Sequence, residues 1–160
     1  MYAKLAVLIL FLASWSSPDV DKMYSKEYHA NGSLKAEGWI QNNTKTNFWI
    51  FYHDNGQVAS EGHYANNNKS GYWHFYNSQG KVIKEGHYKN GVAENWWIFY
   101  DLATNKKEKI QYQNNQKNGF CLVYQGRKLQ KVEKYENDVH KGTWTDIRSF
   151  KRDNPEVSLY

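Results

Sequence analysis

Cysteine and proline are nearly absent from this chain. Cys121 is the single cysteine, which excludes an internal disulfide and any cysteine-rich zinc site. Proline occurs only twice in 160 residues, which favours strands, because proline cannot donate to a strand ladder. Runs of like charge are also missing, and the net charge of +5 is spread along the chain. We interpret it as a solvated lysine-rich exterior; weak attraction to anionic surfaces is the alternative.

Aliphatic side chains are scarce, whereas aromatic ones are abundant. The chain has 13 tyrosines, seven tryptophans and seven phenylalanines. Aromatic residues favour strands because they pack well on a half-buried pleated surface. This composition argues against an ordinary aliphatic core and predicts a thin sheet whose faces are covered by flat rings.

The aromatic residues recur with a fixed period. Trp49, Trp73 and Trp97 are 24 residues apart, and so are Tyr52, Tyr76 and Tyr100. A period of this size is the signature of a repeat architecture. Five copies fit the frame, at about residues 25–48, 49–72, 73–96, 97–120 and 121–143, within a repeat domain of residues 18–145.

Two of the copies depart from the pattern. The fourth lacks both its Asn-Gly turn and its Glu-Gly pair, and in the fifth Cys121 takes the place of tryptophan. We interpret Cys121 as a small core residue. Residues 146–160 are predicted to be a tail that caps the last strand.

Residues 1–17 lie outside the repeat and predict a signal peptide. Lys4 is followed by about eleven apolar residues, too short for a bilayer span of about twenty. Small residues follow, with a cleavage position after Ser16. The expected location is outside the cytoplasm: periplasmic, associated with the outer membrane, or secreted. An uncleaved anchor or a buried first strand are the alternatives, and without a signal the protein would be cytoplasmic.

Each copy alternates strand-like runs with turn signals, which predicts an all-β fold: an elongated, single-layer antiparallel meander of about ten strands. Asn55-Gly56 predicts a two-residue hairpin loop, as do Asn31-Gly32 and, more weakly, Gln79-Gly80. The second turn of each copy is rich in asparagine and is expected to be longer, as in residues 66–69. Gly56 and Gly80 are therefore structural turn positions.

The predicted loops set the register. The first places Trp49 opposite Gly62 and Tyr52 opposite Ala59; the second places Trp73 opposite Gly62 and Tyr64 opposite Gly71. Gly62 and Gly86 would each lie between two indoles. One face would then carry Trp and Phe over these glycines. The other would carry a predicted interaction surface of Tyr52, Tyr76, Tyr100, Tyr124, His63 and His87, with Glu61 and Glu85.

At this point the pattern resembles a known family. Gly-x-Trp-x-x-Tyr, then Asn-Gly, then Glu-Gly-x-Tyr, repeated every 24 residues, is similar to the bacterial variant of the MORN repeat. The resemblance covers copies one to five and is specific in copies two and three. It implies an elongated antiparallel meander without catalytic residues. It also implies two roles: some bacterial relatives are labelled antitoxins, and eukaryotic relatives are associated with membranes and scaffolds.

The sequence predicts no catalytic, cofactor or metal site. His63 and His87 recur at the repeat period, which places them about 9.5 Å apart, two strands away. Zinc ligands must converge within about 2.1 Å of the metal. A ladder of Glu37, Glu61 and Glu85 follows from repeat duplication. Stacking on single-stranded nucleic acid is disfavoured, because packing alone explains the aromatic period.

The function we expect is a non-enzymatic interaction module of the cell envelope or exterior. An unidentified protein partner would bind through the tyrosine-bearing face or an open sheet edge. An antitoxin or immunity protein that binds a toxin directly is the first alternative. A module that binds glycans or a membrane surface is the second, since rows of aromatic rings suit flat sugars.

Overall fold

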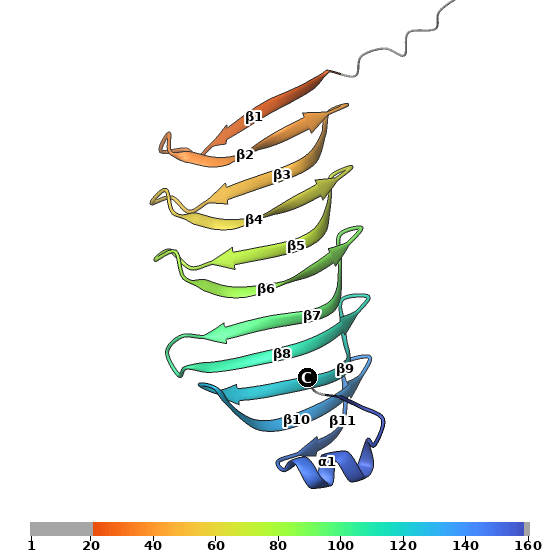
Figure 1. Ribbon diagram of the computed structural model, residues 1–160. Coiled ribbons are helices and arrows are strands. Elements are labelled where there is room, and N and C mark those ends of the chain that lie inside the picture. The colour runs from red at the N-terminus through yellow and green to blue at the C-terminus, as the bar shows by residue number, and fades with distance from the viewer. Residues whose placement is uncertain (1–20, 159–160) are drawn as a thin grey trace, which may run out of the picture.

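The computed structural model describes residues 21–158, which form one antiparallel sheet and a short helix. The eleven strands pair strictly in sequence order, so the sheet is a meander in a single layer (Figure 1). The strands are β1 (Lys22–Tyr28), β2 (Leu34–Gln41), β3 (Thr44–Tyr52), β4 (Val58–Ala65), β5 (Asn68–Tyr76), β6 (Val82–Lys89), β7 (Val92–Asp101), β8 (Lys106–Gln113), β9 (Gln116–Gln125), β10 (Lys128–Glu136) and β11 (Val139–Trp144).

The predicted fold class is therefore confirmed, with one strand more than expected. The predicted copies meet inside β3, β5, β7 and β9. Five copies thus contain five whole even-numbered strands and parts of six odd-numbered ones. At about 4.8 Å per strand spacing, the ribbon is about 48 Å long.

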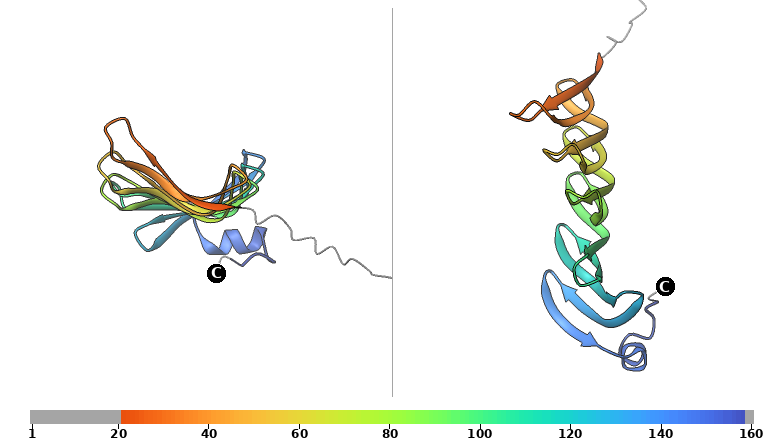
Figure 2. Two further views of the ribbon diagram at one scale, coloured as in Figure 1. Left: turned by 90° about the horizontal axis from the view of Figure 1, so that it is seen from above. Right: turned by 90° about the vertical axis from the view of Figure 1, so that its left-hand side faces the viewer.

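The sheet is not flat, because each of these four strands bends at an irregularity in the pairing. Glu61 pairs with His74 and His63 with Ser70, so β5 places three residues opposite Gly62. One residue of each bend has a positive φ: Asn47 (58°), Gly71 (70°), Asn95 (61°) and Gly119 (112°). These positions follow the 24-residue period. Seen end-on, the ribbon is a trough with a concave inner and a convex outer face (Figure 2).

The core lies on the inner face. Trp49 and Trp73 are fully buried there, and Trp97 nearly so. Each indole lies over a glycine: a Cβ added to Gly62 would be 2.4 Å from Cδ2 of Trp73. The same relation joins Trp49 to Gly38 and Trp97 to Gly86.

The prediction that tryptophans pack over glycines is thus correct, and the two tryptophans beside each glycine differ in how closely they approach it. Trp49 pairs with Gly62 across β3 and β4. The atoms nearest to a Cβ on Gly62 nevertheless all belong to Trp73. Gly62 therefore lies between its pairing partner Trp49 and the closer indole of Trp73, and Gly86 lies in the same way between Trp73 and Trp97, as predicted.

The indole nitrogens compensate for the backbone bends. Nε1 of Trp73 donates to the carbonyl of His63, 3.1 Å away, beside the irregularity in pairing. Trp49 and Trp97 donate in the same way to the carbonyls of Trp39 (3.0 Å) and His87 (3.1 Å). A buried carbonyl without a partner is costly, so tryptophan supplies both bulk and the missing donor.

The two kinds of turn are the reverse of the prediction. Asn66 and Asn67 both have positive φ and join the paired residues Ala65 and Asn68, so this loop has two residues. Positive φ at both central positions is the I′ geometry of tight hairpins. The asparagine-rich turns at 90–91, 114–115 and 137–138 have the same signs of φ.

The Asn-Gly turn at 55–56 is the longer one. Gly56 donates to the carbonyl of His53 at 2.8 Å, and only Gly56 (81°), not Asn55, has a positive φ. A register shift follows, so Tyr52 pairs with Val58 and not with Ala59. At the other end of β4, Tyr64 pairs with Lys69 of β5 and not with Gly71.

The tight turns connect successive copies. The Asn67 side chain accepts a hydrogen bond from the backbone N–H of Lys45 (2.6 Å), and the Asn67 N–H donates to the Lys45 carbonyl (3.0 Å). Asn115 forms the same pair of bonds with Ala93. These asparagines therefore both form a turn and fix the neighbouring copy.

The C-terminal segment includes a helix that the sequence reading did not specify. Helix α1 (Ile147–Asp153) begins at Asp146, whose side chain accepts from the N–H groups of Arg148 and Ser149. It lies on the outer face at the β11 end of the ribbon (Figure 2). Its Phe150 is fully buried against Leu122 and Val132.

Candidate functional site

The predicted tyrosine face is the outer face of the ribbon, and its main feature is a ladder of tyrosine–glutamate bonds. The hydroxyl of Tyr76 donates to Oε1 of Glu61 at 2.6 Å. Tyr52 and Tyr100 bind Glu37 and Glu85 in the same way, at 2.6 and 2.7 Å. Each bond crosses from one copy to the preceding one, so the ladder holds the copies in register and fixes the rings.

The ladder changes the ionisation of these tyrosines. Burial, followed by the hydrogen bond to a carboxylate, raises the pKa of Tyr52 and of Tyr76 to about 12. The pKa of Tyr100 is raised as well, for the same reasons. In the opposite direction, the hydrogen bond from Tyr52 contributes most to lowering the pKa of Glu37. In the pair of Tyr52 and Glu37, the neutral phenol and the charged carboxylate are thus the stable states.

Tyr124, the fourth predicted tyrosine, is on the same face but in a different environment. It packs against the cluster of Leu122, Val132 and Phe150 beneath α1. The ammonium group of Lys107 is 4.5 Å from the centre of its ring. The fifth copy therefore continues the outer face as an apolar seat for the helix.

The predicted histidines lie beside a second aromatic row that the sequence reading missed. The His63 ring is 5.1 Å from that of Phe48, and the His87 ring is 4.8 Å from that of Tyr72, in both cases edge to face. Phe48, Tyr72, Trp96 and Phe120 recur every 24 residues. The 24-residue period of this row was evident in the sequence. Strict alternation of the two faces from Trp49, however, could not predict how the bend orients these rings.

The outer face is most open at its first copies. Trp39 is 37% exposed and Phe48 is 40% exposed. Tyr24 packs edge-on against Trp39, with 5.2 Å between ring centres. Near the other end of the same face, Phe120 is covered by Phe150 at 5.5 Å.

The inner face carries a continuous column of rings with lysines above them. Neighbouring rings in the column are 6.0 to 6.3 Å apart, in the order Trp49, Phe51, Trp73, Phe75, Trp97 and Phe99. The Lys45 ammonium is 3.7 Å from the Trp49 ring, and that of Lys69 is 4.5 Å from the Trp73 ring. Burial lowers the pKa of Lys69. With the tryptophans buried, this face mainly serves as the core.

The two ends of the sheet differ. Of the strands in residues 21–158, β1 pairs only with β2, so it forms an edge of the sheet. Met23, Tyr24 and Tyr28 are exposed on it. At the other end, α1 lies next to β11 (Figure 1). An edge strand can pair with another chain, so β1 is the second candidate surface.

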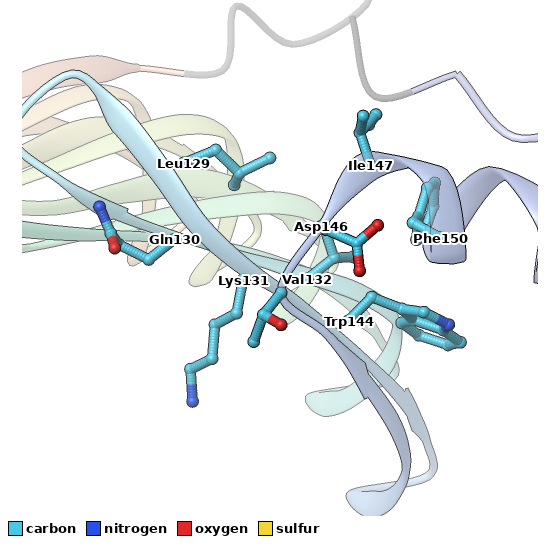
Figure 3. Close-up of a pocket in the computed structure, with 9 residues that line it drawn as sticks. Leu129, Gln130, Lys131, Val132, Trp144, Asp146, Ile147 and Phe150 are labelled. Atoms are coloured by element: carbon cyan, nitrogen blue, oxygen red, sulfur yellow. The ribbon is translucent and has the colours of Figure 1, made fainter.

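A pocket of about 250 Å³ lies between β10 and α1 (Figure 3). Leu129 and Val132 line it from the sheet, and Ile147 and Phe150 from the helix. The Lys131 side chain points away from α1 and binds Glu133. The pocket is the apolar gap beneath a docked helix, without converging polar groups suited to catalysis.

Metal and membrane features can be stated for the described residues. From Asp21 to Ser158, the His, Cys, Asp and Glu side chains form no group of three or more that could hold a metal ion. In the same part of the chain, no helix has both the length and the apolar character required to cross a bilayer.

The comparisons with known proteins agree with the repeat. The family model of the MORN repeat variant matches residues 49–66 and 69–90, which lie in copies two and three, where the resemblance is most specific. The match supports a MORN-repeat protein, and this family is a non-catalytic module for protein or membrane interaction. A comparison with curated proteins found no match.

Proposed function

We propose that this protein is a non-enzymatic interaction module of the cell envelope or exterior, and that it binds a protein partner through its outer face. The proposal depends chiefly on the ladder of Tyr52, Tyr76 and Tyr100, in which the same half-exposed ring recurs with the same hydrogen bond. Fixed tyrosines lose little freedom on binding and offer both apolar and polar contacts, which is why they are enriched at interfaces.

The outer face suits a protein partner for a second reason. It combines the ordered tyrosines with exposed apolar rings, Trp39 and Phe48, and with half-buried carboxylates such as Glu37 and Glu85. Interfaces combine an apolar, aromatic centre with a polar rim. The inner face offers less, because its tryptophans are already buried.

The partner is tested by affinity capture of the full chain from its native cells, after brief cross-linking and with quantitative mass spectrometry. Changing Tyr52, Tyr76 and Tyr100 together to Ser should abolish capture of the partner. The matched triple change to Phe retains the rings and should keep most of the capture. Circular dichroism checks that both variants fold. If the folded Ser variant captures the partner as well as the wild type, the outer face is not the binding surface.

The location is part of the proposal and is supported by the apolar run after Lys4. The intact mass of the protein from its native cells tests it. Loss of about the first sixteen residues would establish export. A full-length mass would mean a retained anchor or a cytoplasmic protein. It would favour the antitoxin alternative, for which a co-purifying toxin would be the decisive finding. Glycan arrays and liposome flotation address the other alternative, and retention on either would replace the protein partner.

A further inference from the structure

The chain shows on its own outer face how a helix can bind there. Phe150 of α1 is fully buried, with its ring 5.5 Å from that of Phe120, edge to face. Leu122 and Val132, which are paired across β9 and β10, complete the seat. The helix thus places the ring of Phe150 in a seat formed by Phe120 and by the cross-strand pair of Leu122 and Val132.

The junction of copies one and two contains the same arrangement without a helix. Phe48 and Ile50 lie three repeat periods, or 72 residues, before Phe120 and Leu122. Ile50 pairs with Glu61 across β3 and β4, as Leu122 pairs with Val132, with one residue lost in copy five. Since the repeat preserves the order of faces along each strand, this seat at the junction of copies one and two faces outward as well. Here, however, Phe48 is 40% exposed and neighbouring Trp39 is 37% exposed.

The two seats differ at several positions, and at one of them a charge replaces an apolar side chain: Glu61 stands where copy five has Val132. Oε1 of Glu61 accepts the bond from Tyr76. The equivalent carboxylates have a nitrogen-bearing side chain beside them: Nζ of Lys26 is 3.5 Å from Glu37, and Nε2 of His74 is 3.3 Å from Glu85. Within the described part of the chain Glu61 has no ion pair: Ile50 lies opposite it on β3, and His74, opposite it on β5, contacts Glu85 instead.

We propose that Trp39, Phe48, Ile50, Glu61 and His63 form a docking site for a helix of a protein partner. The partner helix would place an aromatic or large apolar residue on Phe48 and Ile50, and a lysine or arginine beside Glu61. This inference rests on the proposed function and identifies the class of partner segment. A second copy of the chain is a poorer occupant, because its own α1 already buries Phe150.

The site is tested by replacing Phe48 with the photo-cross-linker p-benzoylphenylalanine in the full chain, in its native cells. The expected product is one partner protein, cross-linked through a helix-forming segment that carries an aromatic residue and a basic one. Leu102, which is 46% exposed in the turn between β7 and β8, provides the control position and should give no such product. Cross-linking to lipid, to glycan or to a second copy of the chain would overturn the inference, as would equal products from both positions.

The role of Glu61 is tested with a synthetic peptide of the cross-linked segment and the full chain. Glu61→Gln retains the shape and the acceptor for Tyr76, and it should weaken peptide binding about tenfold. Lys26→Gln, a change beside the carboxylate of Glu37, is the matched control and should leave binding unchanged. Equal affinity of the wild type and Glu61→Gln would show that no cation of the partner reaches this carboxylate.

The two proposals fail in distinguishable ways. If Phe48→Ser leaves affinity capture of the partner intact while the triple tyrosine change abolishes it, the helix site is wrong and the interaction module stands. If neither the wild type nor any variant captures a partner, the proposed function itself fails. Melting temperatures of the Phe48→Ser and Glu61→Gln variants show whether a loss of binding reflects unfolding.

Discussion

At the scale of single residues, the fold depends on close contacts between backbone and indole rings. A Cβ on Gly62 would lie 2.4 Å from Cδ2 of Trp73, a distance that real structures do not tolerate. Trp73 has little room to move, because it is fully buried and its Nε1 is bound to the carbonyl of His63. Glycine is therefore required here for space, and its backbone conformation is ordinary.

Gly62→Ala should accordingly destabilise the protein by about 1–3 kcal/mol, the usual cost of overpacking a core. Urea unfolding of the variant and the wild type measures the difference. Ser60→Ala, two residues away on the same strand and face, is the control and should have a much smaller effect. If both variants unfold at the same urea concentration, the contact is not as described.

In the fourth and fifth copies, a larger residue takes the glycine position and a smaller one takes the tryptophan position, so the pair fills the same space. Where the earlier copies pair Gly with Trp, Ile110 pairs with Cys121, and both are nearly fully buried. Burial contributes most to raising the pKa of Cys121 to about 12. This thiol is therefore a neutral packing residue, as the sequence predicted.

The exchange predicts a compensating pair of mutations. Cys121→Trp alone should clash with Ile110, and Ile110→Gly alone should leave a cavity; each should destabilise by about 2–4 kcal/mol. The double variant should be more stable than the sum of the two effects implies. A double-mutant cycle of unfolding free energies measures this coupling. Strict additivity would mean that the two positions do not share one space.

At the scale of strands, the tyrosine–glutamate ladder couples stability to alkaline pH. The pKa of Tyr76 is about 12 in the folded protein and near 10 when unfolded. Because the folded pKa is higher, the contribution of Tyr76 is complete below about pH 10 and is lost as pH rises towards 12.

The stability advantage of the wild type over Tyr76→Phe should therefore decrease between about pH 10 and pH 12. Urea unfolding of both proteins at a series of pH values measures it, and the two proteins differ in no other titratable group. An advantage that stays constant across this interval would show that Tyr76 does not retain its proton in the fold.

The strands also show what the sequence could and could not predict. The alternation from Trp49 to Tyr52 placed indole and phenol on opposite faces, and the pairing of Trp49 with Gly62 was correct. The turns were reversed, because Asn-Asn can adopt the two-residue geometry as readily as Asn-Gly. The pairing of Phe51 with Ser60 was still predicted correctly, because a register shift between Phe51 and Tyr52 offsets the longer loop that begins at His53.

At the scale of the whole molecule, stability should be nearly a sum over copies, since each strand pairs only with its sequence neighbours. Deleting residues 73–96 joins Tyr72 to Trp97 and retains the frame of both flanking copies. We expect a folded, shorter ribbon with lower stability. Circular dichroism and urea unfolding test this. A control deletion of residues 85–96 removes half a period and should not fold cooperatively. Equal behaviour of the two deletions would contradict the repeat.

The trough and the docked helix were the least predictable parts of the whole. The bends need positive φ at Asn47, Gly71, Asn95 and Gly119, residue types that adopt it readily, but these positions stand inside strand-like runs and were not recognised as bends. Helix α1 is seven residues long, too short for a helical period to be evident. The candidate tyrosines were found from their period, whereas Phe48 was missed because its exposure depends on the bend.

The aligned bends have a mechanical consequence. Four of them, spaced by one period, form a lengthwise crease, as in a strip of paper folded along its middle. A creased strip resists bending much better than a flat one. The crease therefore stiffens the protein into a beam, and equivalent side chains of successive copies stay about 9.6 Å apart. A partner that contacts several copies would therefore need binding groups with the same fixed spacing. Groups displaced by half a copy could not make the same contacts.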